Sequence, residues 1–185
     1  MIYIKIFVSF LSLTLSLKLY ANKGPETGLD IPRFVALKSS DVNLRVGPSL
    51  NYPINIKYIK INLPIEITDE FDAWRKIKDY DNNIGWIHKS LIKGDRFIIS
   101  GTKKTTSVNI YNRPRGKIIG NIKKNNILNL KSCLINWCNV YNDEIAGWVS
   151  KNKIWGVYET EIYNKSFYQP IISYYWKILD KNWLK

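Results

Sequence analysis

The chain has few residues whose types could support covalent or metal chemistry. It contains two cysteines, Cys133 and Cys138, and one histidine, His88. A cysteine nucleophile needs a histidine base beside it, and a structural zinc site needs four ligands. The paired acids, Asp69-Glu70 and Asp143-Glu144, are neighbours on expected turns, so we expect them to be surface acids. The sequence shows no nucleophile elbow and no glycine-rich phosphate loop, so we expect no enzyme activity, no cofactor and no metal.

Residues 1–21 have the pattern of a signal peptide. Lys5 comes early, an apolar stretch runs from Ile6 to about Leu17, and Ala21 offers a small residue before a cut. The stretch is shorter than the about 20 residues that span a bilayer and fits the apolar region of a signal peptide. We expect an exported protein of the periplasm or cell envelope. An uncleaved N-terminal anchor is the alternative, and it gives the same side of the membrane.

Export permits the two cysteines to be oxidised. Cys133 and Cys138 enclose Leu134, Ile135, Asn136 and Trp137. If residues 134–136 form a tight turn, the cysteines face each other across a hairpin, and we expect a disulfide between them. Free thiols are the alternative.

The chain contains an internal repeat. Both copies show the same order of landmarks, and the spacings agree to within one residue from the tryptophan onward. In the first copy the landmarks are Val42-Asn43-Leu44, Pro48, Trp74, Gly85-Trp86-Ile87 and Gly94. In the second copy they are Val108-Asn109-Ile110, Pro114, Trp137, Gly147-Trp148-Val149 and Gly156.

Each copy is predicted to form short strands. In the first copy, residues 42–46 alternate, with Val42, Leu44 and Val46 on one face, and residues 54–61 alternate in the same way. Residues 65–67, 74–77 and 86–88 give further strands, with a hairpin turn at residues 81–83. About five strands in so short a unit predict a closed or nearly closed barrel, which protects strand edges. The fold class is therefore all-β, with two tandem small barrels.

These residues resemble the bacterial SH3-like domain family. The family pattern is an aliphatic-Asn-aliphatic-Arg strand, then Gly-Pro-Ser, a later Trp and Gly-Trp-aliphatic. Here it is carried by Val42-Asn43-Leu44-Arg45-Val46-Gly47-Pro48-Ser49, Trp74 and Gly85-Trp86-Ile87. In the second copy Tyr111 replaces Arg45, and Arg113 replaces Gly47. The resemblance implies SH3-like modules at residues 33–95 and 103–157, of the kind that targets proteins to cell walls, with residues 158–185 as a C-terminal extension.

Aromatic residues near loops of the first module are the candidates for ligand binding. Aromatic-lined grooves accept extended peptides, and flat rings beside an arginine suit sugar rings or carboxylates. The candidate residues are Arg45, Tyr52, Trp74, Tyr80, Trp86 and His88. The alternatives are that Trp74 and Trp86 belong to the core, that Arg45 pairs with Asp41 or Asp72, and that His88 is a solvated strand residue.

The two modules differ in net charge. The net charge is +13, and residues 103–156 hold ten Lys or Arg against two Asp or Glu, whereas residues 39–94 hold eight against seven. Such a surplus favours anionic partners, although a chain rich in Ile, Lys and Asn is also typical of an AT-rich genome. If they share a face, seven residues would form an anion patch: Lys103, Lys104, Arg113, Arg115, Lys117, Lys123 and Lys124. Export makes nucleic acid a poor partner.

The C-terminal extension is aromatic and cationic. Pro170 is compatible with the first turn of a helix, so the extension is a candidate helix. Its composition suits peripheral contact with a membrane interface through residues 167–184. Packing across the two barrels is the alternative, and it is favoured because the apolar residues are spread too evenly for an amphipathic stripe.

Two functions follow from these features. The first is a non-enzymatic periplasmic binding protein for peptidoglycan or peptide ligands, with an open aromatic groove in at least one module. The second is a structural or adaptor protein of the cell envelope, which holds a protein partner or a membrane surface through the basic second module and the aromatic tail.

Overall fold

A computed structural model describes residues 22–102 and 105–164. The predicted signal peptide, Lys103, Lys104 and the candidate helix after Pro170 lie outside the described residues. Within the described ranges, no helix has both the length and the apolar character to cross a membrane.

The first sheet follows a short N-terminal hairpin of β1 (Asn22–Lys23) and β2 (Asp30–Ile31). Its strands are β3 (Arg33–Leu37), β4 (Val42–Arg45), β5 (Ile54–Tyr58), β6 (Pro64–Phe71), β7 (Trp74–Lys78), β8 (Ile84–His88) and β9 (Ile92–Lys93). A 3-10 turn, η1 (Lys89–Leu91), joins β8 to β9. The spatial order is β5-β4-β8-β7-β6-β3-β9, with antiparallel neighbours.

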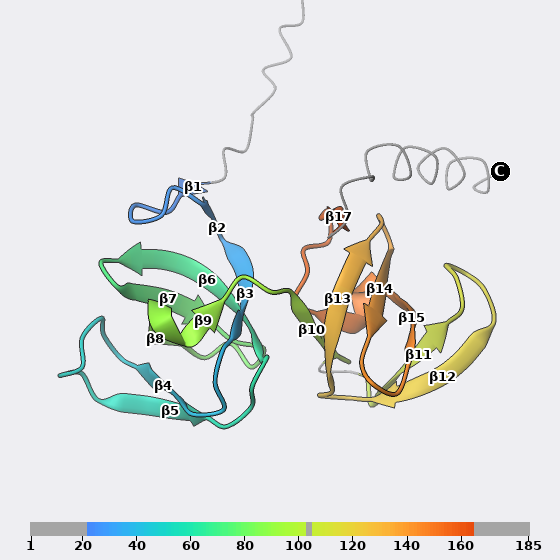
Figure 1. Ribbon diagram of the computed structural model, residues 1–185, viewed down its shortest axis with the longest axis horizontal. Coiled ribbons are helices and arrows are strands. Elements are labelled where there is room, and N and C mark those ends of the chain that lie inside the picture. Colours follow the sequence, from blue (N-terminus) through green and yellow to red (C-terminus); the bar gives the residue numbers. More distant parts are fainter. Residues whose placement is uncertain (1–21, 103–104, 165–185) are drawn as a thin grey trace, which may run out of the picture.

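The second sheet lies beside the first, joined to it through the segment from β9 to β10 (Figure 1). Its strands are β10 (Phe97–Ser100), β11 (Ser107–Tyr111), β12 (Ile118–Lys123), β13 (Ile127–Cys133), β14 (Trp137–Tyr141), β15 (Ala146–Ser150) and β16 (Ile154–Trp155). The turn η2 (Lys151–Lys153) precedes β16, and β17 (Tyr163–Asn164) pairs with β13. The order β12-β11-β15-β14-β13-β10-β16 repeats that of the first sheet strand for strand. The repeat in the sequence is therefore a repeat in topology.

Each sheet curls around one apolar core. Fully buried side chains from different strands of the first sheet, among them Leu37, Leu44, Ile65, Ile77 and Ile87, form a single cluster. The second sheet has a matching cluster of its own. Because successive side chains of a strand alternate between faces, the residues between these core positions point outward. This alternation puts candidate binding residues such as Trp86 on the outer face of the sheet.

Two details of the predicted strands are wrong. Val46 was expected to share the inner face with Leu44, but the register shifts between Leu44 and Arg45, the strand ends at Arg45, and Val46 is 56% exposed. The strand expected over residues 54–61 ends at Tyr58, which leaves Ile59 and Ile61 exposed in a loop. A bulge and a strand end change the face of a side chain without changing the apolar pattern.

A buried carboxylate ties the N-terminal hairpin to the first sheet. Glu70 in β6 accepts hydrogen bonds from the Thr27 hydroxyl at 2.8 Å and the Thr27 backbone N–H at 2.9 Å, and pairs with Arg33 at 2.6 Å. Burial by itself raises the pKa of Glu70, but hydrogen bonds from Arg33 and Thr27 and the charge of Arg33 outweigh it and lower this pKa to about 2. Glu70, expected to be a surface acid, is 3% exposed.

The predicted disulfide is present in the second module. Cys133 in β13 and Cys138 in β14 are cross-strand neighbours joined by a disulfide, and both are fully buried. The backbone N–H of Leu134 donates to the carbonyl of Trp137, which closes the turn. The bond therefore fixes the start of β14, the strand that carries Trp137.

Aromatic rings join the two modules. Phe34 in β3 packs against Trp155 and Tyr158 of the second module, with ring centroids 5.0 and 4.7 Å apart. The Tyr158 hydroxyl donates to Glu66 in β6 at 3.0 Å.

A partly buried ion pair supports the same junction. Arg96, between β9 and β10, donates to both carboxylate oxygens of Glu161 at 2.6 and 3.0 Å, and to the carbonyl of Gly156. Its guanidinium also lies over the rings of Tyr163 and Phe34. The modules thus meet through packed and hydrogen-bonded side chains.

Candidate functional site

Trp86 lies on the outer face of the first module. It follows Gly85 and precedes Ile87, which is fully buried in the core, so the Trp86 side chain points away from the core. Its partners across the sheet are Arg45 in β4 and Lys76 in β7. Trp86 is partly exposed, and the outer face therefore presents an indole between two strands that carry basic residues.

Arg45 supports the neighbouring loop, contrary to the expected pairing with Asp41 or Asp72. Its guanidinium donates to the carbonyls of Leu50 and Tyr52, at 3.0 and 2.7 Å. Asp41 instead pairs with Lys57. Arg45 bridges the loop between β4 and β5, because its Nη1 group carries two N–H donors, one for each carbonyl.

Tyr52 belongs to that loop and lies over Gly47. A β-carbon on Gly47 would come within 2.6 Å of the Tyr52 ring, so this position requires glycine for the close approach. Tyr52 is 46% exposed, and Leu50 beside it in the loop is 72% exposed. The loop held by Arg45 therefore presents apolar surface at the end of β4.

Trp74 and His88 form a second contact on the outer face. They are cross-strand partners in β7 and β8, with ring centroids 5.4 Å apart in an edge arrangement. Trp74 is only 8% exposed, which agrees with the alternative that it is a packed residue. His88 caps η1, where its ring nitrogen accepts from the backbone N–H of Ser90.

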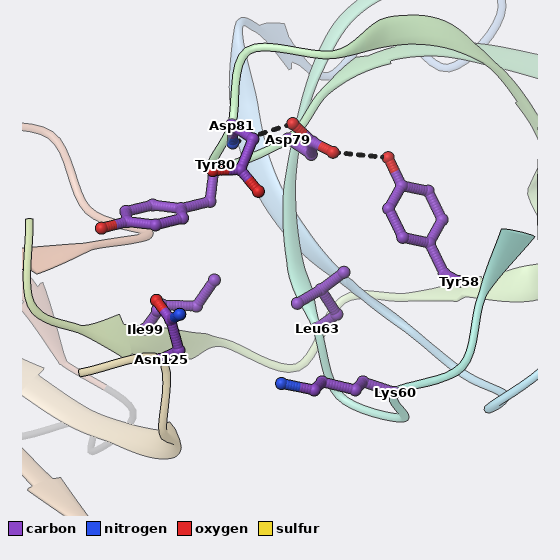
Figure 2. A pocket seen from close by; sticks show the side chains of 8 residues that line it. All are labelled: Tyr58, Lys60, Leu63, Asp79, Tyr80, Asp81, Ile99 and Asn125. Carbon is purple, nitrogen blue, oxygen red and sulfur yellow. Dashed lines mark hydrogen bonds between the residues drawn. The ribbon is translucent and has the colours of Figure 1, made fainter. Parts of the chain in front are cut away.

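Tyr80 lies apart from the other candidates, at the junction of the modules. Its ring meets Trp155 edge-on at 5.9 Å, and its hydroxyl donates to the carbonyl of Gly101 at 3.4 Å. It lines a cleft of about 200 Å³ between the modules, together with Tyr58, Lys60, Leu63, Asp79, Asp81, Ile99 and Asn125 (Figure 2). The structure thus brings Arg45, Trp86, Trp74 and His88 onto one face, with Tyr52 in the loop at its end, and places Tyr80 elsewhere.

The second module has a matching aromatic face that the candidate set missed. Trp148 pairs with Tyr111 and with Asn139, as Trp86 does with Arg45 and Lys76. The rings of Tyr111 and Trp137 are 5.1 Å apart, edge to face. All three aromatic residues are partly exposed. The alignment of the two copies contained the signal, since these residues occupy the positions of Arg45, Trp74 and Trp86.

The expected cations of the second module divide between the two ends of one hairpin. Arg113, Arg115 and Lys117 lie in the loop that joins β11 to β12, whereas Lys123 and Lys124 lie at the far end of β12. A six-residue strand separates these ends by about 20 Å. The two groups therefore do not form one compact patch.

No group of three or more His, Cys, Asp or Glu side chains with the arrangement of a metal site occurs in residues 22–102 and 105–164. The two cysteines are occupied in the disulfide. His88, the single histidine of the chain, is engaged with Ser90 and Trp74.

A family model for the bacterial SH3 domain matches residues 38–94 and 104–156. The chain belongs to the bacterial SH3 domain family. Each matched segment covers most of one curled sheet and leaves out its first strand, β3 or β10, so the predicted fold, two tandem SH3-like modules in an all-β chain, is confirmed.

Two solved structures are similar to parts of this tandem SH3 protein. NlpC2 from Trichomonas vaginalis is 13% identical, with 66% of this chain and 47% of that chain covered and a TM-score of 0.30. NlpC1 from the same organism is 14% identical, with 76% of this chain and 50% of that chain covered and a TM-score of 0.30. The chain therefore spans about half the length of these proteins. No curated protein matches it.

Proposed function

We propose that this tandem SH3 protein is an exported, non-enzymatic binding protein that holds peptidoglycan, by its glycan or its peptide, through the outer aromatic faces of its modules. The observation that carries the proposal is the partly exposed Trp86, which lies between Arg45 and Lys76 across the sheet. Trp148 repeats the same position in the second module.

The chemistry of the outer faces fits such ligands. An indole offers a large flat surface with little conformational entropy to lose, and sugar rings and extended peptides both stack on such surfaces. Lys76 adds a cation beside Trp86 for the carboxylates of an acidic wall polymer. Arg45 contributes indirectly, because its guanidinium holds the loop that carries Tyr52.

Two further observations support export and a place at the cell wall. The disulfide between Cys133 and Cys138 is of a kind that persists in oxidising compartments. The family match to the bacterial SH3 domain covers both modules, and modules of this kind resemble wall-targeting units. Together with the signal-peptide pattern of residues 1–21, these features favour the periplasm or the cell envelope.

One observation favours the adaptor function as a second candidate. Strand β12 is an edge of the second sheet and carries Ile118 and Ile119, which are 58% and 50% exposed. An exposed edge strand offers unpaired backbone groups to a strand from another protein. In this function the partner is an envelope protein, and the basic residues of the β11–β12 loop lie next to it.

The direct experiment is sedimentation of the purified chain with insoluble peptidoglycan across a series of salt concentrations. The wall-binding proposal expects retention that survives high salt, because stacking on indoles is not screened. Retention only at low salt would show that the interaction depends on the net charge of the protein and not on the aromatic faces. Failure to sediment at any salt concentration would contradict wall binding and favour the adaptor function.

A further inference from the structure

The cleft at the junction exists only because two modules are joined. Tyr58, Lys60, Leu63 and the segment 79–81 come from the first module, whereas Ile99 and Asn125 come from the second. Its volume of about 200 Å³ equals the liquid volume of about seven water molecules. The cleft therefore has room for a small molecule or for the end of a larger one.

Two of the polar side chains in the cleft are already committed to the fold. Asp79, which is 5% exposed, accepts from the Tyr58 hydroxyl at 2.8 Å, from the Asn83 amide group at 2.9 Å, and from the backbone N–H groups of Asp81 and Asn83. Burial and this hydrogen bond raise the pKa of Tyr58 above its usual range, so its hydroxyl stays a donor. Tyr58 and Asp79 form a closed wall of the cleft.

Two charged side chains of opposite sign in the cleft have no partner among the described residues. Among the described residues, neither the carboxylate of Asp81 nor the ammonium of Lys60 has a hydrogen bond or ion pair. Figure 2 shows Asp81 beside Tyr80 at one side of the cleft, and Lys60 and Asn125 at the other. The cleft therefore has a negative side and a positive side.

Apolar groups lie between the two charges. Leu63 and Ile99 line the cleft between its two charged sides (Figure 2). The Tyr80 ring, fixed by Trp155 and Gly101, gives an aromatic surface beside Asp81. A cation near Asp81 that lies over the face of the Tyr80 ring would meet both a carboxylate and the negative face of the ring, a combination that attracts ammonium groups.

We propose that the junction cleft binds a small zwitterion with an α-ammonium group, a carboxylate and an apolar side chain. The ammonium lies at Asp81 beside Tyr80, the carboxylate lies at Lys60 and Asn125, and the apolar side chain packs on Leu63 and Ile99. A free amino acid and the end of a short peptide share this chemistry. The inference goes beyond the proposed function, because neither Trp86 nor Trp148 lines the cleft.

The test is a titration of the full chain, followed by NMR, with L-leucine and with L-alanyl-L-leucine at millimolar concentrations. N-acetyl-leucine and leucinamide serve as matched probes that lack the ammonium and the carboxylate respectively. We expect saturable shifts at Tyr80, Ile99 and Asn125 with a zwitterion and much weaker shifts with either blocked form. Saturation by leucine points to a free amino acid, whereas saturation by the dipeptide alone points to a peptide end.

Variants test the roles of the two charged side chains in binding. Asp81→Asn and Lys60→Gln should each weaken zwitterion binding by about two- to fivefold, a modest loss because both groups are solvent-exposed. Asp143→Asn, an exposed acid on a turn of the second module, makes the same charge change and should have no effect. The absence of shifts with both zwitterions, or equal affinity in Asp81→Asn and the parent chain, would overturn the proposal. Sedimentation with peptidoglycan is a separate assay, so either proposal can fail alone.

Discussion

The hydroxyl of Tyr158 donates to Oε1 of Glu66 at 3.0 Å, across the junction of the two modules. The acceptor carboxylate also pairs with Lys78 on the outer face of the first sheet, with 2.5 Å between the charged atoms. Burial and the charge of Glu66 raise the pKa of Tyr158, so the hydroxyl remains a donor across the physiological range. This bond is one of the contacts that hold the junction of the two modules.

We therefore expect Tyr158→Phe to weaken the junction while it keeps the stack on Phe34. Losing one hydrogen bond to a charged group should lower the free energy of unfolding by about 2 kcal/mol. Chemical denaturation of the variant beside the parent chain measures this loss. A variant of unchanged stability, with unchanged NMR shifts in the residues of both modules near the junction, would contradict the assigned role.

Glu70 predicts a specific loss of stability in acid. Its folded pKa of about 2 lies below the ordinary value of 4.5. The stabilisation is therefore complete above about pH 4.5 and is lost as the pH falls toward about 2. Glu70→Gln should lower the free energy of unfolding by about 3 kcal/mol at neutral pH and by little at pH near 2. The difference between the two stability–pH curves is the measurement, and a difference that does not change with pH would exclude this account.

The hydrogen bonds of Arg45 lead us to expect that its substitution loosens the loop between β4 and β5. Arg45→Gln removes the bonds to the carbonyls of Leu50 and Tyr52, so residues 46–53 should be cleaved faster by a protease while the core strands exchange amide hydrogens at the parent rate. Asp41→Asn, which disturbs only the exposed pair with Lys57, is the matched control. Equal cleavage of the variant and the parent chain would show that the loop does not depend on Arg45.

The pattern of landmarks in the sequence was sufficient to predict the fold and its duplication. The landmarks Val-Asn-aliphatic, Trp and Gly-Trp-aliphatic lie at a strand start or one residue after it in both modules, and the same sheet order is found twice. The inner or outer face of Val46 was not predictable, because a bulge after Leu44 shifts the register without a signature in the apolar pattern.

The candidate site was predicted only in part. Trp86 and His88 lie on one outer face because they are two residues apart in a strand, which a sequence shows directly. The junction position of Tyr80 depends on Trp155 and Gly101 of the second module, and no local pattern indicates a contact between modules. The burial of Glu70 likewise depends on Thr27 and Arg33, far away in the chain.

The disulfide predicts a stability that depends on redox conditions. Opening the short loop between Cys133 and Cys138 should cost about 2 kcal/mol by chain entropy. Urea unfolding of the parent chain should shift to a lower midpoint with reductant, whereas the Cys133→Ala/Cys138→Ala variant should be insensitive to it. A parent midpoint that is the same with and without reductant would contradict a stabilising disulfide.

The central claim is that the outer aromatic faces bind the cell wall, and the most direct measurement compares Trp86→Ala, Trp148→Ala and the double variant in sedimentation with peptidoglycan at high salt. Ile59→Ala, which removes an exposed apolar side chain from the loop between β5 and β6, is the control. We expect each tryptophan variant to lose binding by about tenfold or more, as for truncation of a central aromatic contact, and the double variant to remain in solution. Retention of the double variant at the parent level would contradict the account.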